Sequence, residues 1–185
     1  TMSRKIFLVL GQSGSGKTTL IDNALSNIDN LSRMNGCTTR EKRIKENCNN
    51  LFLTDEQFNN YINKDLFIEW EEYAGIKHGL LKSSIDIQKN LIMEITPCGY
   101  FNFLKYLKDN NLKEDVFKIY IYAEKHFIEK RLKEERKMEQ EEFYSRVQED
   151  KKQFSNHINY DIEIENNNKD SLDIFLNFIK EKIGE

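Results

Sequence analysis

Eight consecutive residues near the start of the chain have the types and spacing that phosphate binding requires. They read Gly11-Gln12-Ser13-Gly14-Ser15-Gly16-Lys17-Thr18, which matches the pattern G-x-x-x-x-G-K-[ST]. The glycines permit a sharp turn, so successive backbone N–H groups can converge on phosphate oxygens. In this pattern the lysine reaches the β- and γ-phosphates and the final hydroxyl ligates Mg²⁺. We therefore predict a phosphate-binding loop (P-loop), with Lys17 on the phosphates and Thr18 on the metal.

The segments on both sides of this loop favour the same interpretation. Residues 5–10 form an almost unbroken apolar run that suits a buried parallel strand. After the loop, apolar residues recur at helical spacing, at Leu20, Ile21, Ala24, Leu25 and Ile28. A helix that begins at the loop adds its dipole to phosphate binding. The alternative, a Gly- and Ser-rich turn that binds nothing, is disfavoured by the match of the motif and both flanks.

Two groups of arginines further along the chain could bind anions. The first is Thr38-Thr39-Arg40-Glu41-Lys42-Arg43, in which arginines three positions apart follow two hydroxyls. Arginine matches phosphate bidentately, although a charge run is more often a solvated loop. The second is the charged stretch 124–153, which carries Arg131, Arg136 and Arg146. That stretch suits either a solvated helical face or a mobile lid that brings arginines to a transferring phosphoryl group.

Composition narrows the classes of partner. The 185 residues carry a net charge of −3, with 38% apolar and 32% charged side chains, which gives no case for nucleic acid or an anionic membrane. No apolar run approaches the ~20 residues of a membrane span, and no secretory signal is visible. Three cysteines without C-x-x-C spacing and three scattered histidines argue against zinc and disulfides. We expect one cytoplasmic domain that binds small molecules, as a monomer or a homodimer.

The order of predicted elements indicates an α/β fold with a parallel sheet. Strands are expected at 5–10, 49–54, 66–73, 76–81, 91–95, 116–122 and 160–164. Helices are expected at 18–28, 55–63, from Pro97 onward, 124–153 and 171–183, with a helical turn at 83–89 and a polar loop at 30–35. Thr54 and Gln57 form a capping box before the second helix. Residues 36–81 therefore constitute a small β-rich insertion between strands of the main sheet.

With these segments in place, the chain resembles the guanylate kinases over almost its full length. The resemblance rests on the P-loop, on Thr38-Thr39-Arg40-x-x-Arg43-x-x-Glu46, and on Phe67-Ile68-Glu69-Trp70. It extends to Gly79, Arg131-Leu132, Arg146 and Tyr160-Asp161 followed by Asn166. It implies a P-loop NTPase three-layer core (1–32, 89–125 and 151–185), a GMP-binding lobe (33–88) and a helical lid (126–150). The activity that it implies is Mg²⁺-dependent transfer of the ATP γ-phosphoryl group to GMP or dGMP.

The resemblance also implies a role for individual residues. The catalytic residues would be Lys17, Arg131, Arg136 and Arg146, which would neutralise negative charge on the transferring phosphoryl group. ATP would be bound by Ser13, Gly14, Ser15, Gly16, Lys17, Thr18, Thr19 and, near the adenine, Asn166. The acceptor would be bound by Thr38, Arg40, Arg43, Glu69, His78 and Gly79. Glu69 would accept hydrogen bonds from guanine N1–H and its exocyclic amine, a pair of donors that adenine does not offer on that edge.

Several positions on the acceptor side depart from the family pattern. Asn50 and His78 stand where the family has tyrosines that contact the acceptor phosphate. Gly36 and Thr96 replace a serine and an aspartate, and Leu80-Leu81 follow Gly79 where the family has threonine or serine. Two alternatives therefore stay open beside GMP kinase activity. One is a kinase of the same fold with another acceptor, such as ribose 1,5-bisphosphate or another nucleotide, and the other is a non-catalytic binding module.

Overall fold

A five-stranded parallel sheet forms the centre of the computed structural model, which describes residues 4–42, 50–73, 75–135, 139–154 and 157–185. All four strand pairings in this sheet are parallel. In order across the sheet, the strands are β2 (Leu31–Arg33), β7 (Asn90–Glu94), β1 (Lys5–Leu10), β8 (Asp115–Tyr122) and β9 (Ile162–Glu165). The strand that leads into the P-loop, β1, therefore lies in the middle of the sheet, where its carboxyl end is held on both sides.

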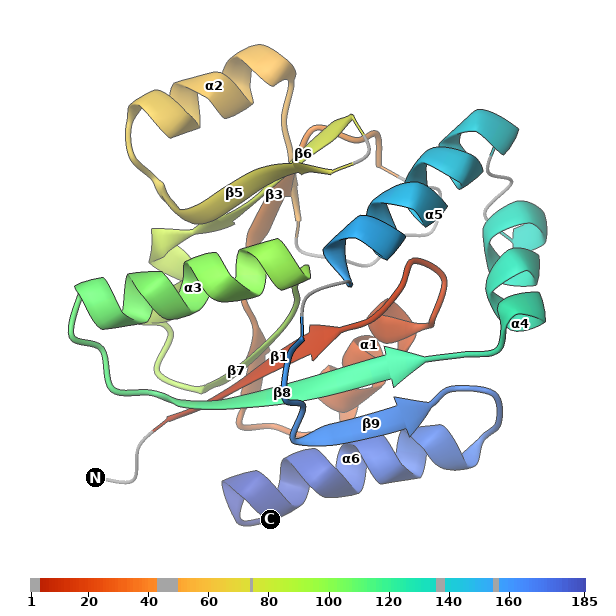
Figure 1. Cartoon of the computed structure of the whole chain (residues 1–185). Coiled ribbons are helices and arrows are strands. Elements are labelled where there is room, and N and C mark those ends of the chain that lie inside the picture. Colours follow the sequence, from red (N-terminus) through yellow and green to blue (C-terminus); the bar gives the residue numbers. More distant parts are fainter. Residues whose placement is uncertain (1–3, 43–49, 74, 136–138, 155–156) are drawn as a thin grey trace.

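Helices cover both faces of this sheet (Figure 1). On one face, Phe7 and Val9 of β1 pack in a cluster with α1 (Lys17–Asn27) and α6 (Asp170–Ile183). On the other face, Ile6, Leu8 and Leu10 pack with Phe103 and Leu107 of α3 (Pro97–Asp109). Successive side chains of a strand point to opposite faces, so an apolar run without alternation is buried on both. The predicted three-layer α/β fold is confirmed.

The residues between β2 and β7 build a second, smaller sheet. Its strands are β4 (Leu51–Phe52), β3 (Gly36–Thr38), β6 (Ile76–Leu81) and β5 (Phe67–Tyr73), in that order. Helix α2 (Asp55–Asn63) begins at the predicted capping box of Thr54 and Gln57. It packs on this sheet through Phe58, whose ring stacks on Phe67 at a centroid distance of 4.7 Å. This four-stranded sheet confirms the β-rich insertion that the sequence predicts.

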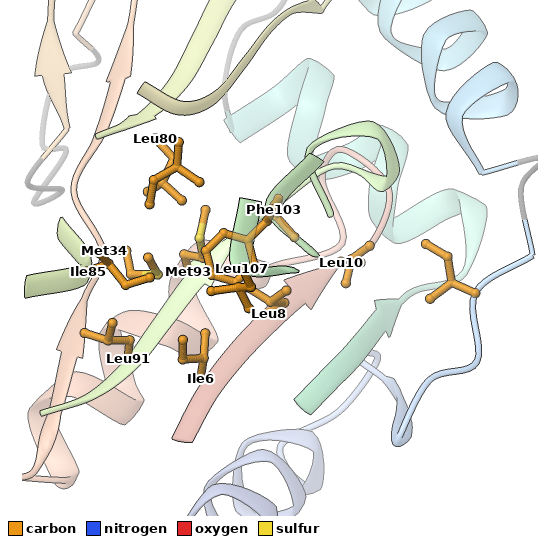
Figure 2. Packing of buried hydrophobic residues seen from close by; sticks show 13 residues of the cluster. Ile6, Leu8, Leu10, Met34, Leu80, Ile85, Leu91, Met93, Phe103 and Leu107 are labelled. Atoms are coloured by element: carbon orange, nitrogen blue, oxygen red, sulfur yellow. The ribbon is translucent and has the colours of Figure 1, made fainter. Parts of the chain in front are cut away.

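The two sheets share one apolar cluster, which fixes the smaller sheet against the larger (Figure 2). Leu80 of β6 and Ile68 of β5 lie in the same cluster as Leu8 of β1 and Phe103 of α3. Ile85 joins it from the short 3₁₀ helix at Lys82–Asp86, close to where a helical turn is predicted. The N-terminal end of α3, capped by Thr96, consequently lies beside β5.

Two predictions about elements are wrong. The polar loop expected at 30–35 contains β2, which pairs in parallel with β7 and buries Leu31. A three-residue edge strand with one apolar side chain has no detectable period, which explains the error. The single helix expected over 124–153 is divided into α4 (Lys125–Glu129), a π-helical turn at Lys130–Glu135, and α5 (Gln140–Gln153). The π turn carries Arg131 and the buried Leu132 against the P-loop.

The boundaries assigned to a core, an acceptor lobe and a lid stay a prediction. Among the helices of the described ranges, none combines the length and the apolar character needed to cross a lipid bilayer.

Candidate functional site

The P-loop is a formed turn between β1 and α1. Gly14 and Gly16 have φ values of 80° and 96°, in the backbone region that residues other than glycine rarely adopt. A Cβ atom on Gly16 would lie 2.1 Å from Nδ2 of Asn166, and one on Gly14 would lie 2.9 Å from Cγ of Leu132. These two glycines are therefore required both by the backbone turn and by neighbours that approach it closely.

Lys17 and Thr18 hold the start of α1 to the surrounding loop and strand. The Lys17 ammonium donates to the carbonyl oxygens of Gly11 and Gln12, at 2.7 and 3.0 Å. The Thr18 hydroxyl donates to Oε1 of Glu94 at 2.6 Å. Glu94 is the last residue of β7, next to β1 in the sheet. An acidic residue there, beside the P-loop hydroxyl, is the arrangement in which P-loop enzymes hold Mg²⁺.

Arg131 and Asn166 contact the outer side of the P-loop. Asn166 donates from Nδ2 to the carbonyl oxygen of Ser15 at 2.8 Å, and its own Oδ1 accepts from the Ser171 hydroxyl at 2.7 Å. Arg131 donates to the carbonyl oxygens of Gly14 and Asn166, at 3.2 and 2.9 Å. Arg131, which the sequence assigns to catalysis, and Asn166, which it assigns to ATP binding, therefore both lie at the loop and support its backbone.

A cavity of about 240 Å³ opens between the P-loop, the smaller sheet and α5. It brings together ten of the side chains or loop positions that the sequence assigns to the site: Ser13, Gly14, Gly16, Lys17, Thr18, Arg40, Glu69, His78, Gly79 and Arg146. Register places His78 of β6 opposite Thr38 of β3, so these two candidates are neighbours at its edge. The arrangement places the predicted phosphate-binding loop and the predicted acceptor residues around one space.

Other assigned residues lie outside the lining of this cavity. Ser15 and Thr38 are buried, and the Thr38 hydroxyl accepts from the backbone N–H of Arg40 at 3.3 Å. Thr19 is exposed on α1. Arg43 and Arg136, predicted for the acceptor phosphate and for catalysis, fall outside the described residues.

Glu69 is an acidic side chain that the fold leaves without a full set of partners. Within the described ranges, only two buried side-chain oxygens lack a hydrogen-bond partner, Ser15 Oγ and Glu69 Oε2. Burial and the negative charge of Glu71 raise the pKa of the Glu69 carboxyl to about 8. An unsatisfied buried acceptor costs free energy, so this oxygen is suited to accept a hydrogen bond from a ligand.

Glu71 follows on the same face of β5, and both of its carboxylate oxygens are satisfied. One accepts from the Thr96 hydroxyl and the other from Nε2 of Gln153, at 3.0 Å in the second case. Thr96, which replaces an aspartate of the family pattern, thus binds a carboxylate supplied by the neighbouring strand. Of the other departures, Gly36, Asn50, His78 and Leu80 line the cavity, and Leu80 also belongs to the shared apolar cluster.

Sequence reasoning missed several residues that line this cavity, among them the ionisable side chains Arg33, Glu71, Tyr73, Glu94 and Asp150. Glu94 had a signal, since it is an acidic residue at the end of an apolar strand that follows the P-loop unit. Asp150 had none, because it stands in a helix with many other charged residues. In the described ranges, no group of three or more His, Cys, Asp or Glu side chains could hold a metal ion. Mg²⁺ takes only one or two protein oxygens beside phosphates and waters, so Thr18 and Glu94 fit it.

Comparison with known proteins identifies a family model that matches nearly the whole chain and relatives that match part of it. The family model described as guanylate kinase matches residues 3–182. The guanylate kinase of Malacoplasma penetrans is 36% identical over 124 residues, 63% of this chain and 61% of that protein. The guanylate kinase of Mesomycoplasma hyopneumoniae (strain 7448) is 34% identical over 142 residues, 70% of this chain and 72% of that protein. Against the Malacoplasma and Thermotoga maritima relatives, the match spans 61% and 53% of their length.

A solved structure supports the fold independently. The crystal structure of guanylate kinase from Anaplasma phagocytophilum superposes with a TM-score of 0.67 and covers 97% of this chain and 87% of that one. Its sequence is 19% identical, so this likeness concerns the fold alone.

Proposed function

The chain belongs to the guanylate kinase family, and we propose that it transfers the γ-phosphoryl group of ATP to GMP or dGMP, giving ADP and the nucleoside diphosphate. The observation that carries this proposal is Glu69, which lines the same cavity as the P-loop and whose buried Oε2 lacks a hydrogen-bond partner in the described structure. Guanine offers two adjacent donors on one edge, which a carboxylate can accept together. Adenine would leave that carboxylate unpaired, at a cost of several kcal/mol.

On the triphosphate side, the backbone of residues 13–19 and Lys17 bind the phosphates. Lys17 exchanges its bonds to the Gly11 and Gln12 carbonyls for phosphate oxygens, which are better partners because they carry charge. Arg131 and Arg146, together with Arg136, stabilise charge on the transferring group. Asn166 holds the loop and faces the adenine end. Phosphoryl transfer depends on positioning and electrostatic stabilisation, so no side-chain general base is needed.

On the acceptor side, Arg40 and Arg43 bind the GMP phosphate and Glu69 binds the base. The Thr38 hydroxyl supports Arg40 by accepting a hydrogen bond from the backbone N–H of Arg40. His78 supplies a donor to the phosphate where the family pattern has tyrosine, and Gly79 contributes its backbone to the lining of the cavity. The nucleotide substrates ATP and GMP are the partners proposed.

Thr18 and Glu94 would hold the Mg²⁺ that accompanies ATP. The bond between them, 2.6 Å long, already places the hydroxyl and carboxylate oxygens within reach of one ion. When bound, the ion neutralises charge on the β- and γ-phosphate oxygens. Arg33, 3.9 Å from Oε1 of Glu94, helps to keep that carboxylate in place.

The proposal is tested by the release of ADP in a coupled assay with ATP·Mg²⁺ and a panel of acceptors. The panel contains GMP, dGMP, IMP, AMP, UMP, CMP, dTMP and ribose 1,5-bisphosphate. We expect strong preference for GMP or dGMP. Preferential turnover of another acceptor would reject the proposed substrate, and binding of ATP without any turnover would reject the proposed activity.

A further inference from the structure

One buried carboxylate connects three segments that are far apart in the sequence. Asp150, on α5, is 7% exposed. Its Oδ2 accepts a hydrogen bond from the backbone N–H of Ser13 in the P-loop, at 2.9 Å. Its Oδ1 accepts from the hydroxyl of Tyr73, the last residue of β5. Asp150 is therefore in direct contact with the triphosphate-binding loop and with the strand that carries Glu69.

This contact is well defined and costly to break. Burial and the negative charge of Asp150 hold the pKa of the Tyr73 hydroxyl well above its usual range, so the hydroxyl stays a donor. Hydrogen bonds to a charged acceptor are stronger than neutral ones, and a buried charge that loses its partners is strongly destabilising. The two bonds thus favour one relative position of β5 and the P-loop.

A second contact holds the same helix to the same strand. Gln153 lies one helical turn after Asp150 and donates to Glu71, two residues before Tyr73. Glu69, Glu71 and Tyr73 occupy alternate positions of β5, so they share one face of the strand. The end of α5 therefore holds the part of β5 next to Glu69, and of these two α5 side chains it is Asp150 that also bonds to the P-loop, at Ser13.

We propose that Asp150 is a positioning residue that couples the acceptor-binding strand to the P-loop, so that binding of the acceptor and binding of the triphosphate are thermodynamically linked. The inference rests on the proposed function, because it takes Glu69 as the acceptor residue. Misplacement of reactants by about 1 Å costs on the order of 10²-fold in rate, so a residue that sets the distance between the two sites acts on turnover. Linkage requires that each ligand change the affinity of the other by the same factor.

Calorimetry tests the coupling with a non-hydrolysable ATP analogue in the absence and presence of saturating GMP. We expect wild-type protein to show a coupling factor of about 5 or more, a typical lower bound for such linkage. In Asp150→Ala the factor falls to about 1 and kcat falls roughly 10- to 100-fold, while each ligand alone binds within about threefold of wild type. Asp150→Asn, whose amide oxygen still accepts from the backbone N–H of Ser13, should retain most of the coupling and most of kcat. Tyr73→Phe loses the coupling but keeps the fold.

Gln148→Ala is the matched control, because this side chain is exposed on the same helix. Unchanged coupling and unchanged kcat in folded Asp150→Ala, or a loss of thermal stability alone, would overturn the inference.

Amide hydrogen exchange separates this failure from failure of the proposed function. If the wild-type protein binds the ATP analogue but not GMP, the proposed acceptor is wrong. The inference then still requires a difference between the two proteins with the analogue alone. In the wild type, the analogue should protect backbone amides of both the P-loop and β5 from exchange. In Asp150→Ala it should protect those of the P-loop only. Protection that is identical in the two proteins would overturn it.

Discussion

The polar side chains at and near the cavity differ in how many of their hydrogen bonds the protein itself supplies. Lys17 and Thr18 are bonded to protein oxygens, and Glu71 has a donor on each carboxylate oxygen. Ser15 Oγ and Glu69 Oε2 have none in the described part of the chain. Buried polar groups are satisfied in the great majority of cases, and of the two exceptions only Glu69 lines the cavity, so it is the one that a ligand could satisfy.

Replacement of Lys17 by alanine is expected to reduce kcat by on the order of 10²- to 10³-fold, the loss typical of one electrostatic contact in a transition state. The variant should fold normally, because Lys17 is only partly buried and the hydrogen bonds to Gly11 and Gln12 lie within the loop itself. Steady-state ADP release and circular dichroism measure the two properties. Full activity in the variant would refute the assignment of the P-loop.

The pH dependence of GMP binding reports the state of Glu69. Only the ionised carboxyl can accept both guanine donors, and its pKa is about 8 in the free protein. The affinity for GMP should therefore rise as pH increases from 6 toward 8 and level off above the pKa. Glu71→Gln removes a negative charge and should shift the midpoint to lower pH, whereas Glu72→Gln, on the exposed side of β5, should not. A pH-independent affinity would exclude Glu69 from the base site.

At the scale of elements, β6 contains a glycine, Gly79, that packing requires and that the sequence also assigns to the acceptor site. Gly79 pairs with Cys37 on one side and Trp70 on the other. A Cβ atom there would lie 2.6 Å from the Phe67 ring and 3.1 Å from the Phe58 ring. The glycine that the family pattern assigns to the acceptor site is thus also required where α2 packs on the sheet.

Gly79→Ala is accordingly expected to lower the free energy of unfolding by about 1–3 kcal/mol, the usual cost of inserting a methyl group into a packed core. Urea denaturation measures the change. Gly75→Ala serves as a control for the loss of a glycine in the same hairpin, since its Cβ position has open space although its φ of 75° carries some strain. Equal stability of Gly79→Ala and wild type would show that the rings move aside.

The elements that the sequence predicts correctly are those with a strong local signal. β1, β7 and β8 are long apolar runs, and α2 has both parts of a capping box. The missed strand β2 is short and lies at the sheet edge, where neighbours rather than its own residues decide its structure. The π-helical turn that divides the expected single helix contacts the P-loop through Arg131 and Leu132, and no local sequence pattern encodes such contacts.

At the scale of the whole molecule, the site lies where three parts of the chain meet. The P-loop follows a central strand, Glu69 comes from the smaller sheet, and Asp150 and Arg146 come from α5 (Figure 1). The motifs alone predict the two nucleotide-binding halves, because their residue types fit the chemistry. The links between the halves, Asp150 to Ser13 and Glu71 to Gln153, arise only on folding.

Because ligands would bridge these parts, they should stabilise the whole fold. An ATP analogue at about 100 times its Kd is expected to add ~2.7 kcal/mol, which corresponds to roughly 5–10 °C in Tm for a chain of this size. Differential scanning fluorimetry with Mg²⁺ measures the shift. Lys17→Ala should show a smaller shift at the same concentration, and an equal shift in both proteins would place the analogue outside the P-loop.

The most direct test of the account is the ratio of kcat/KM for GMP to that for AMP in wild type, Glu69→Ala and Glu72→Ala. The two glutamates lie on the same strand, one on the cavity and one exposed on the opposite face. We predict that Glu69→Ala loses on the order of 10²-fold or more of the preference for GMP, while Glu72→Ala keeps it. An undiminished preference for GMP in Glu69→Ala would contradict the claim that this carboxylate reads guanine.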